Sequence, residues 1–444
     1  MPLLGTRGAA SARGFGFLSL GDRYWIATLG GASNDNGYGI AVDSSGNCYV
    51  TGYDNTTNPG SLEVLITKYD TSGVIQWQRV LGGVNNDRGY GIAVDSSGNC
   101  YVTGFTSSAG AGNADVLITK YNASGTIQWQ RVLGGASTDV GQGIAVDSSD
   151  NCYVVGTTYS AGAGNGDVLV TKYNTSGTIQ WQRVLGGANT DEGYGICVDS
   201  SGNCYIAGYD TDNPGAGTEL LIAKYDTSGT IQWKRKLGGS PNQDNGYGIA
   251  VDSSGNSYVV GYTRNAGSGL QDALIAKYDT SGVIQWQRVL GGANSDFAYG
   301  VAVDSSGNCY ITGYTESTGA GGADVLIAKY NTSGTIQWQR VLGGGSGDVG
   351  YGIAVDSNGN CYVTGYTNSA GAGSEDALIA KLPGDGSKTG TYGPWTYQAS
   401  SLTAATSSLT AATSSLTAST STLTAATSSL TAATSTLTST VTQL

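Results

Sequence analysis

Short runs of alternating apolar and polar residues fill most of this chain, and they come in sets of four. In the second set the runs are residues 91–95, 99–105, 115–122 and 126–133, each rich in Val, Ile, Tyr, Thr or Trp. Such runs are typical of half-buried β-strands. The links between them carry Ser, Asn and Gly, and Gly98 stands where a tight hairpin requires a positive φ. The pattern predicts four short strands per set and no helical segment within it.

The set of four runs repeats along the chain, and a tryptophan marks its fourth run. These tryptophans are Trp25, Trp77, Trp129, Trp181, Trp233, Trp286 and Trp338, so the period is 52 or 53 residues. Seven copies cover residues 22–382. Four strands in each repeat of about 50 residues is typical of a β-propeller. An open solenoid is the competing architecture, but it would need atypical polar repeats at both ends.

The two ends of the array complement each other. It begins with a lone fourth strand, residues 23–31, and ends after a third strand, residues 376–382. We therefore expect the strand around Trp25 to complete the last blade, which closes the ring and removes exposed strand edges. The predicted fold class is all-β, a seven-bladed β-propeller of four-stranded blades closed by the N-terminal strand.

Two phrases express the repeat most fully. They are DALIAKYDTSGVIQWQRVLGG at 272–292 and YGIAVDSNGNCYVTGYT at 351–367. The repeat that they represent resembles the SBBP family of bacterial β-propeller repeats over about 360 residues. The resemblance implies a propeller scaffold and carries no activity, because the family is defined by a scaffold and not by a site.

Composition narrows the function. The 444 residues include no His, which excludes Ser-His-Asp and Cys-His catalytic pairs, His-ligated zinc and His-ligated haem. The formal net charge of −12 argues against a nucleic-acid partner. The near-identical blades offer no paired carboxylate that breaks the symmetry, so we expect neither a glycan hydrolase or lyase nor any other enzyme, and no cofactor.

An aspartate in the loop from each fourth strand to the next first strand is one candidate binding feature. These residues are Asp35, Asp87, Asp139, Asp191, Asp244, Asp296 and Asp348. Sevenfold repetition would place a ring of carboxylates around one mouth of the channel, where oxygen ligands would suit Ca²⁺. The alternative is that each aspartate makes a local Asx turn.

The loop from the second strand to the third is the other candidate, because the repeats differ most there. It opens on the same face as the aspartate loop and follows an aromatic position. The aromatic residues are Tyr53, Phe105, Tyr209, Tyr262, Tyr314 and Tyr366. Small polar loops with aromatic residues suit shallow recognition of a glycan or a protein. They equally suit plain solvated connections.

Residues shared by the blades are expected to pack the scaffold. The tryptophan should fill the gap between neighbouring sheets, and the arginine two residues after it, Arg79 in the first complete repeat, should pair with an acidic residue. Six of the seven cysteines begin the second strands of different blades, and Cys197 and Cys204 fall on opposite pleats. We therefore expect no disulfide bond and synthesis in a reducing compartment.

Residues 398–444 differ in character and contain no charged residue. Leucine recurs there with a step of seven, at Leu402, Leu409, Leu416, Leu423, Leu430 and Leu437. This step gives one stripe on a helix but alternating faces on a strand. It predicts an α-helical coiled coil, three-stranded, that makes the protein a homotrimer, after a linker over 383–397. A flexible linker and a β-structured fibre are the alternatives.

Residues 1–21 are rich in Gly, Ala and Arg. The phrase GTRGAASARGFGF at 5–17 resembles the opening of virion structural proteins from tailed phages, marine and cyanobacterial phages in particular. The resemblance implies an arm that docks on other virion proteins. The chain shows no apolar stretch long enough for a signal peptide or a membrane span. We therefore expect no membrane insertion, synthesis in the host cytoplasm and residence in the virion.

Together these features predict a non-enzymatic phage virion appendage, a tail or head fibre or spike. Its propeller, residues 22–382, would contact a glycan or protein on the host surface. A bacterial surface adhesin is one alternative, against which the missing signal peptide and seven free cysteines count. A structural or decoration protein without a ligand is the other.

Overall fold

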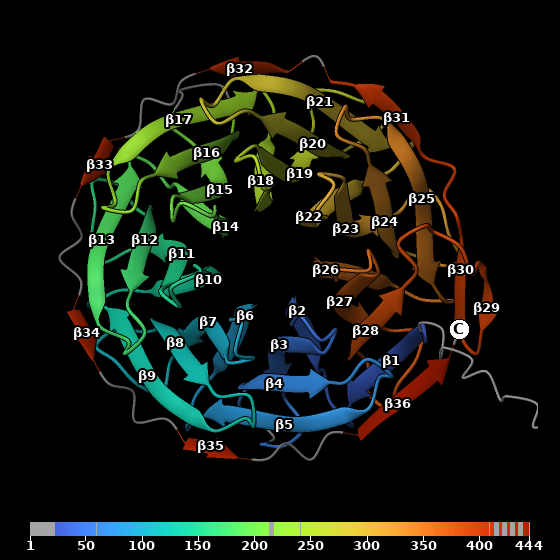
Figure 1. Cartoon of the computed structure of the whole chain (residues 1–444), viewed down its shortest axis with the longest axis horizontal. Coiled ribbons are helices and arrows are strands. Elements are labelled where there is room, and N and C mark those ends of the chain that lie inside the picture. Colours follow the sequence, from blue (N-terminus) through green and yellow to red (C-terminus); the bar gives the residue numbers. More distant parts are fainter. Residues whose placement is uncertain are drawn as a thin grey trace, which may run out of the picture.

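The structure, a computed structural model, describes residues 23–58, 60–212, 217–239, 241–407, 409–412, 417–419, 424–426, 431–433 and 438–443. In these residues the chain forms a ring of seven antiparallel sheets around a central axis, and no helix occurs (Figure 1). The predicted seven-bladed β-propeller with four-stranded blades is confirmed. Residues 1–21, expected to form a docking arm, lie outside the described residues.

Each blade uses its strands in chain order from the axis outward. The first strands are β2 (Asn36–Val42), β6 (Asp87–Val94), β10 (Asp139–Val146), β14 (Glu192–Val198), β18 (Asp244–Val251), β22 (Asp296–Val303) and β26 (Asp348–Val355). The second strands are β3 (Cys48–Asp54), β7 (Cys100–Thr106), β11 (Cys152–Thr158), β15 (Cys204–Asp210), β19 (Ser257–Thr263), β23 (Cys309–Thr315) and β27 (Cys361–Thr367). The third strands are β4 (Glu63–Tyr69), β8 (Asp115–Tyr121), β12 (Asp167–Tyr173), β16 (Glu219–Tyr225), β20 (Asp272–Tyr278), β24 (Asp324–Tyr330) and β28 (Asp376–Leu382). The fourth strands of blades one to six are β5 (Ile75–Gly82), β9 (Ile127–Gly134), β13 (Ile179–Gly186), β17 (Ile231–Gly238), β21 (Ile284–Gly291) and β25 (Ile336–Gly343).

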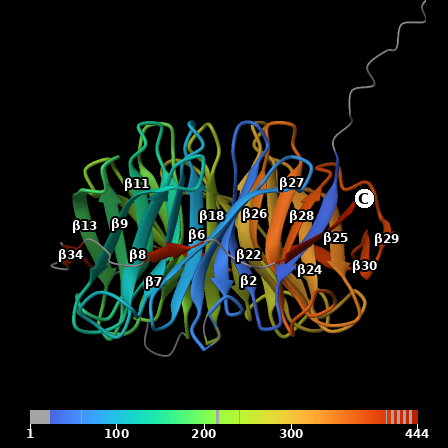
Figure 2. The same ribbon diagram turned by 90° about the horizontal axis from the view of Figure 1, so that it is seen from below.

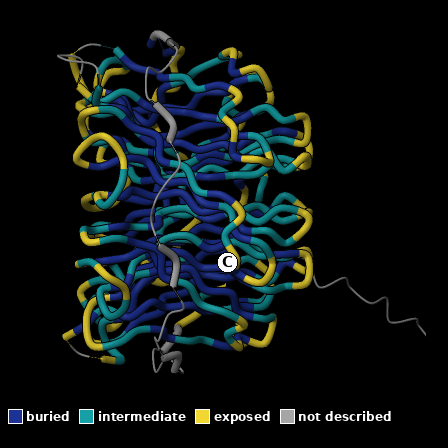
Figure 3. Tube along the Cα trace, turned by 90° about the vertical axis from the view of Figure 1, so that its left-hand side faces the viewer, coloured by how far each residue is buried: buried dark blue, intermediate teal, exposed yellow. Residues whose placement is uncertain are grey.

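The N-terminal strand completes blade seven. β1 (Trp25–Gly30) pairs antiparallel with β28 in the register Trp25↔Lys381 to Leu29↔Ala377. The two strands lie at opposite ends of the repeat array, so their hydrogen bonds close the ring as predicted. Turns on both faces of the ring carry most of the exposed residues, whereas the strands between them are buried (Figures 2 and 3).

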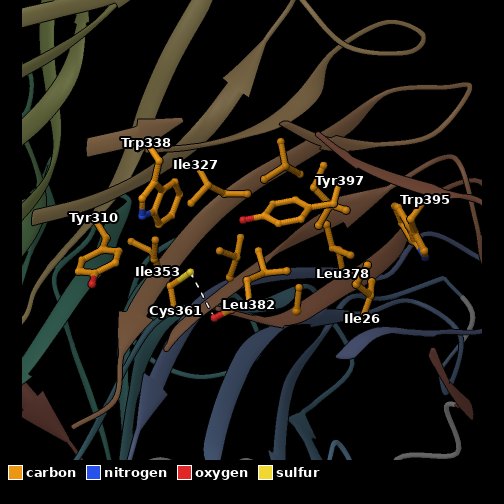
Figure 4. Packing of buried hydrophobic residues seen from close by; sticks show 14 residues of the cluster. Ile26, Tyr310, Ile327, Trp338, Ile353, Cys361, Leu378, Leu382, Trp395 and Tyr397 are labelled. Carbon is orange, nitrogen blue, oxygen red and sulfur yellow. Dashed lines mark hydrogen bonds between the residues drawn. The ribbon is translucent and has the colours of Figure 1, made fainter. Parts of the chain in front are cut away.

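Apolar side chains fill the wedge between each pair of neighbouring blades. Figure 4 shows the junction of blades six and seven, where Trp338 and Ile327 of blade six face Ile353, Cys361 and Leu378 of blade seven. Equivalent clusters occupy the other six junctions. The seven cysteines are all free, and burial raises the pKa of Cys100 to about 12. The expectation of no disulfide bond is confirmed, and these thiols are packing groups.

The repeated tryptophan links each blade to the next, as predicted. The Trp77 ring stacks on Tyr121 of the following blade with a centroid distance of 6.4 Å. Its indole N–H also donates to the Ala123 carbonyl of that blade at 3.0 Å. This contact recurs around the ring and fixes the angle between blades.

The repeated arginine does not bind an acidic residue as expected. Arg79 lies over the Trp77 ring and donates from Nε to the Gly125 carbonyl of the next blade at 2.9 Å. Its equivalents form no salt bridge among the described residues, because the turn carbonyls already accept from the guanidinium. The acidic residues of the repeat pair with lysines instead, as in the 3.9 Å contact of Lys68 with Asp43.

The tail forms a belt around the propeller. After β29 (Gly390–Tyr392), strand β30 (Trp395–Ala399) pairs with β25 and adds a fifth strand to blade six. The further belt strands are β31 (Thr403–Thr406), β32 (Thr410–Ala412), β33 (Thr417–Ser419), β34 (Thr424–Ala426), β35 (Thr431–Ala433) and β36 (Thr438–Gln443). They pair in turn with β21, β17, β13, β9, β5 and β1. The belt therefore runs backward around the ring, one short strand per blade (red in Figure 1; side view in Figure 2).

The seven-residue leucine step matches the passage from one blade to the next. Leu402 and Leu409 are 6% and 7% exposed and join the apolar clusters between blades five and six and between blades four and five. Gln339 and Gln287 donate to the carbonyls of these two leucines, each at 2.8 Å. The described tail residues that pair with the propeller are short strands, and the predicted coiled coil stays a prediction. Leu416, Leu423, Leu430 and Leu437 lie outside the described residues.

Candidate binding face around the central axis

Two sets of loops share one face of the ring, which we call the loop face. They are the loops from fourth to first strands and the loops from second to third strands. In blade one Asp35 connects them, because its Oδ2 accepts from the Gly31 N–H at 2.9 Å and from the Thr56 hydroxyl at 3.1 Å. Its Oδ1 accepts from the Asn55 N–H at 2.9 Å. The loop face is therefore held together from below by a buried carboxylate.

The seven predicted aspartates do not form a ring of exposed carboxylates. Each is 0% exposed, and each accepts a backbone N–H from a glycine of its own loop, as Asp139 does from Gly135 at 2.9 Å. Burial raises the pKa of Asp35 to about 6 and that of Asp191 to about 7. In the described part of the chain no group of three or more His, Cys, Asp or Glu residues could hold a metal. These aspartates anchor loops beneath the face.

The predicted aromatic residues form the outer tier of a double ring near the axis. Tyr53, Phe105, Tyr209, Tyr262, Tyr314 and Tyr366 each contact an aromatic residue of the adjacent first strand at 6.0–6.1 Å between ring centroids. That inner tier is Tyr38, Tyr90, Tyr194, Tyr247, Tyr299 and Tyr351. Its members contact their neighbours across blades at 5.0–5.3 Å. All six inner tyrosines are half-buried, so part of each ring faces the axis.

Blade three interrupts this double ring. Gln142 stands where the inner tyrosine is expected and Thr157 where the outer aromatic residue is expected. The aromatic contacts therefore end at Tyr90 on one side of blade three and at Tyr194 on the other. The face has one polar sector in an otherwise aromatic circle.

A position above the inner tyrosines varies among the blades and carries five different residue types. These residues, two before each inner-tier position, are Asn36, Arg88, Val140, Glu192, Asn245, Phe297 and Val349. We call them the variable tier. The glycine that follows each of them is replaced only once, by Ala298. Within the first strands, variation is thus concentrated where they reach the loop face.

The variable tier contacts the aromatic rings in different ways. The Arg88 guanidinium lies 5.0 Å from the Tyr53 ring centroid, a cation–π contact. Asn36 donates to the Tyr53 hydroxyl at 2.6 Å. The Glu192 carboxylate accepts from the Tyr194 hydroxyl, and burial followed by this carboxylate raises the pKa of Tyr194. Blades one, two and four therefore present an amide, a cation and an anion around one axis.

This arrangement suits binding. Aromatic faces stack on flat apolar surfaces, and the charged and amide groups beside them supply directional hydrogen bonds. The sequence prediction contained the outer tier but missed the inner tyrosines and the variable tier. The variable tier could have been found by comparing the seven copies position by position. The residue after each loop aspartate changes from copy to copy, whereas the aspartate before it and the glycine after it mostly repeat.

Comparison with known proteins identifies the repeat. The family model described as SBBP, beta-propeller repeat, matches residues 25–58, 76–110, 128–162, 180–213, 232–267, 285–319 and 337–371. An uncharacterized WD repeat-containing protein of Acanthamoeba polyphaga mimivirus is 24% identical over 78% of this chain and 36% of its own length. The regulatory protein FlaEY of Caulobacter vibrioides is 25% identical over 68% of this chain and 38% of its own length. The chain thus spans less than two fifths of either curated relative.

A solved structure also aligns with this chain. The WD40 β-propeller domain of Doa1 aligns with 80% of this chain and 96% of its own, with 13% sequence identity and a TM-score of 0.48. Among the described residues of this chain, none belongs to a helix long and apolar enough to cross a membrane.

Proposed function

Because this chain belongs to the SBBP family of β-propeller repeat proteins, we propose that it is a non-enzymatic binding scaffold that recognises a macromolecular partner at its loop face. The observation that carries the proposal is the variable tier. In first strands whose other positions largely repeat, Arg88, Glu192 and Phe297 differ at one equivalent position. A position needed only for packing would repeat with the rest of the blade, whereas a site for one ligand needs different groups around the axis.

A glycan or protein of a host surface is the proposed partner, and a phage virion appendage is the proposed setting. The two-tier aromatic ring supports this choice of ligand, because sugar rings and apolar side chains both stack on aromatic faces. The sequence of residues 5–17, similar to the opening of tailed-phage virion proteins, supports the setting. The N-terminal arm would then attach the propeller to other virion proteins.

The belt competes with the trimeric coiled coil that the same leucines predict. Leu402 and Leu409 are buried against the propeller, so a coiled coil that used them would first have to remove them from it. We propose the belt as the state of the isolated chain. Light scattering of the purified protein should give the monomer mass, and a trimer mass would overturn this part of the proposal.

Binding to a glycan array and to a panel of host cells tests the ligand site. We expect the full chain to bind and the variant Arg88→Ala/Glu192→Gln to lose most of this binding while it keeps its melting temperature. Ser305→Ala is the matched control, since Ser305 is exposed on the opposite face and should leave binding unchanged. Equal binding by the double variant would refute the site, and no binding to any surface would favour a decoration protein without a ligand.

A further inference from the structure

Two acidic residues lie side by side at every blade junction beneath the loop face. At the junction of blades six and seven, the Asp348 N–H donates to the Ala323 carbonyl at 2.7 Å, which places Asp348 beside Asp324. The same backbone bond, 2.7–2.9 Å long, forms at all seven junctions. The pairs are Glu63 with Asp87, Asp115 with Asp139, Asp167 with Asp191, Glu219 with Asp244, Asp272 with Asp296, Asp324 with Asp348, and Asp376 with Asp35.

The pair at the junction of blades six and seven is closed off from solvent and incompletely hydrogen-bonded. Asp348 is 0% exposed and Asp324 is 1% exposed. Asp348 Oδ2 accepts from the Gly344 N–H and the Ser369 hydroxyl, both at 2.8 Å, but Asp348 Oδ1 and Asp324 Oδ2 have no hydrogen-bond partner. Gly343 packs so closely on Asp324 that any side chain there would overlap the carboxylate. Two adjacent buried anions without a counter-charge are costly.

One junction carries its own cation. In blade four Lys236 Nζ lies 2.6 Å from Glu219 Oε2 and 3.7 Å from Asp210 Oδ2. The equivalent position is a valine in blades one, two, three, five and six and Thr28 in blade seven. The valines are Val80, Val132, Val184, Val289 and Val341. No other salt bridge among the described residues reaches a member of these pairs. Six junctions therefore lack the charge that the seventh supplies.

We propose that each of the six lysine-free junctions takes up one proton, so that the loop face is clamped in mildly acidic solution and loosens as the pH rises. Among the described residues, no lysine or arginine forms a salt bridge with Asp324 or Asp348 that could balance their charge instead. Strand β27 and its following loop contribute hydroxyl groups of Thr367 and Ser369, and the loops contribute the N–H groups of Gly344 and Ala320. Two carboxylates alone also fall short of the six to eight oxygen ligands that Ca²⁺ takes.

The pKa values support this geometry. Burial, and next the Asp348 carboxylate, raise the pKa of Asp324 to about 7. In an opened junction Asp324 regains its ordinary pKa of 3.8. Because the pKa of Asp324 is higher in the closed junction, protonation stabilises the closed junction. This stabilisation is complete at low pH and is lost as the pH rises from 3.8 to about 7. We therefore expect the opening constant to rise about tenfold per pH unit between about pH 5 and 7 and to level off above about pH 7.

Hydrogen exchange of the full chain, corrected for intrinsic exchange rates and measured at several pH values, tests the proposal. Amides of residues 320–325 and 344–349 should lose protection by about a hundredfold between about pH 5 and pH 7 in the wild type. In Asp348→Asn the new amide can donate to Asp324, so we expect this loss to shrink to less than about threefold. Lys236→Gln should introduce the same pH dependence at the junction of blades four and five.

Asp304→Asn is the matched control on the opposite face. Asp304 lies 3.7 Å from Lys329, and its hydrogen bonds with Asn308 lower its pKa, so this variant should leave the pH dependence of the loop face unchanged. Protection that is independent of pH in the wild type, or an equal pH dependence in Asp348→Asn, would overturn the proposal. Restoration of protection by Ca²⁺ and its loss on chelation would overturn it in favour of a metal site.

Discussion

Replacement of Leu409 by alanine separates the belt from a coiled coil. Leu409 is 7% exposed and packs with Leu237 of blade four and Val289 of blade five. Removal of a buried leucine side chain costs about 2–5 kcal/mol, and the lower end applies here because the belt lies at the rim and can relax. About 2 kcal/mol corresponds to a roughly 30-fold larger opening constant for this part of the belt.

The measurement is hydrogen exchange of the outer strands in the full chain. In Leu409→Ala we expect faster exchange at β31 and β32 and at the edges of β21 and β17 that they cover, with β5 and its belt strand unchanged. Gln285→Ala is the control, because Gln285 is exposed on the same strand β21 and its amide donates within its own turn, to Asp279 Oδ2 and the Val283 carbonyl. Unchanged exchange together with dissociation of an oligomer in light scattering would refute the belt and restore the coiled coil.

Three further predictions follow from packing. Gly186→Ala should destabilise the fold by about 2 kcal/mol or more in thermal unfolding, because a Cβ there would lie 1.5 Å from Asp167 Oδ1. Gly345→Ala is the control, because its Cβ would meet nothing within 4 Å, and it should change stability by less than about 0.5 kcal/mol. Deletion of residues 1–30 should leave blade seven without its fourth strand and yield aggregates in size-exclusion chromatography, and a monodisperse variant with unchanged melting would contradict the closure. The six fully buried cysteines should react with a thiol reagent only after denaturation, because burial raises their pKa and excludes the reagent; rapid reaction of all seven in native protein would disprove this.

Repetition made the fold predictable. The blade count follows from the period of the tryptophans, such as Trp25, Trp77 and Trp129. The closure follows from the incomplete strand sets at both ends, and both predictions depend on local strand patterns. The tail was different, because its strands bind a surface that exists only after the ring has formed. The step of seven in Leu402 and Leu409 fits a helix in isolation, but on the propeller it measures the distance from one blade gap to the next.

The candidate site was predictable only in part for a related reason. Tyr53 and its equivalents precede a loop that varies between repeats, which marks them as candidate binding residues. Tyr38 lies inside a repeated strand motif whose pattern is typical of core residues. The aspartates were expected at the mouth of the axis because repetition places them in a ring. Repetition does not predict how deeply a side chain is buried. Asp139 and its equivalents accept hydrogen bonds from loop glycines and are buried beneath the loop face.

Symmetry itself connects these findings. Where every blade needs the same contact, as at Trp77 on Tyr121, the sequence repeats and the residue packs the ring. Where one blade differs, the departure has a local consequence. Lys236 replaces a valine and neutralises a carboxylate, while Gln142 and Thr157 open the aromatic circle. A partner that bound every blade alike would favour the same residue at the equivalent positions of Arg88 and Glu192. Because these residues differ in charge, we propose that the ligand contacts several blades at once and in one orientation.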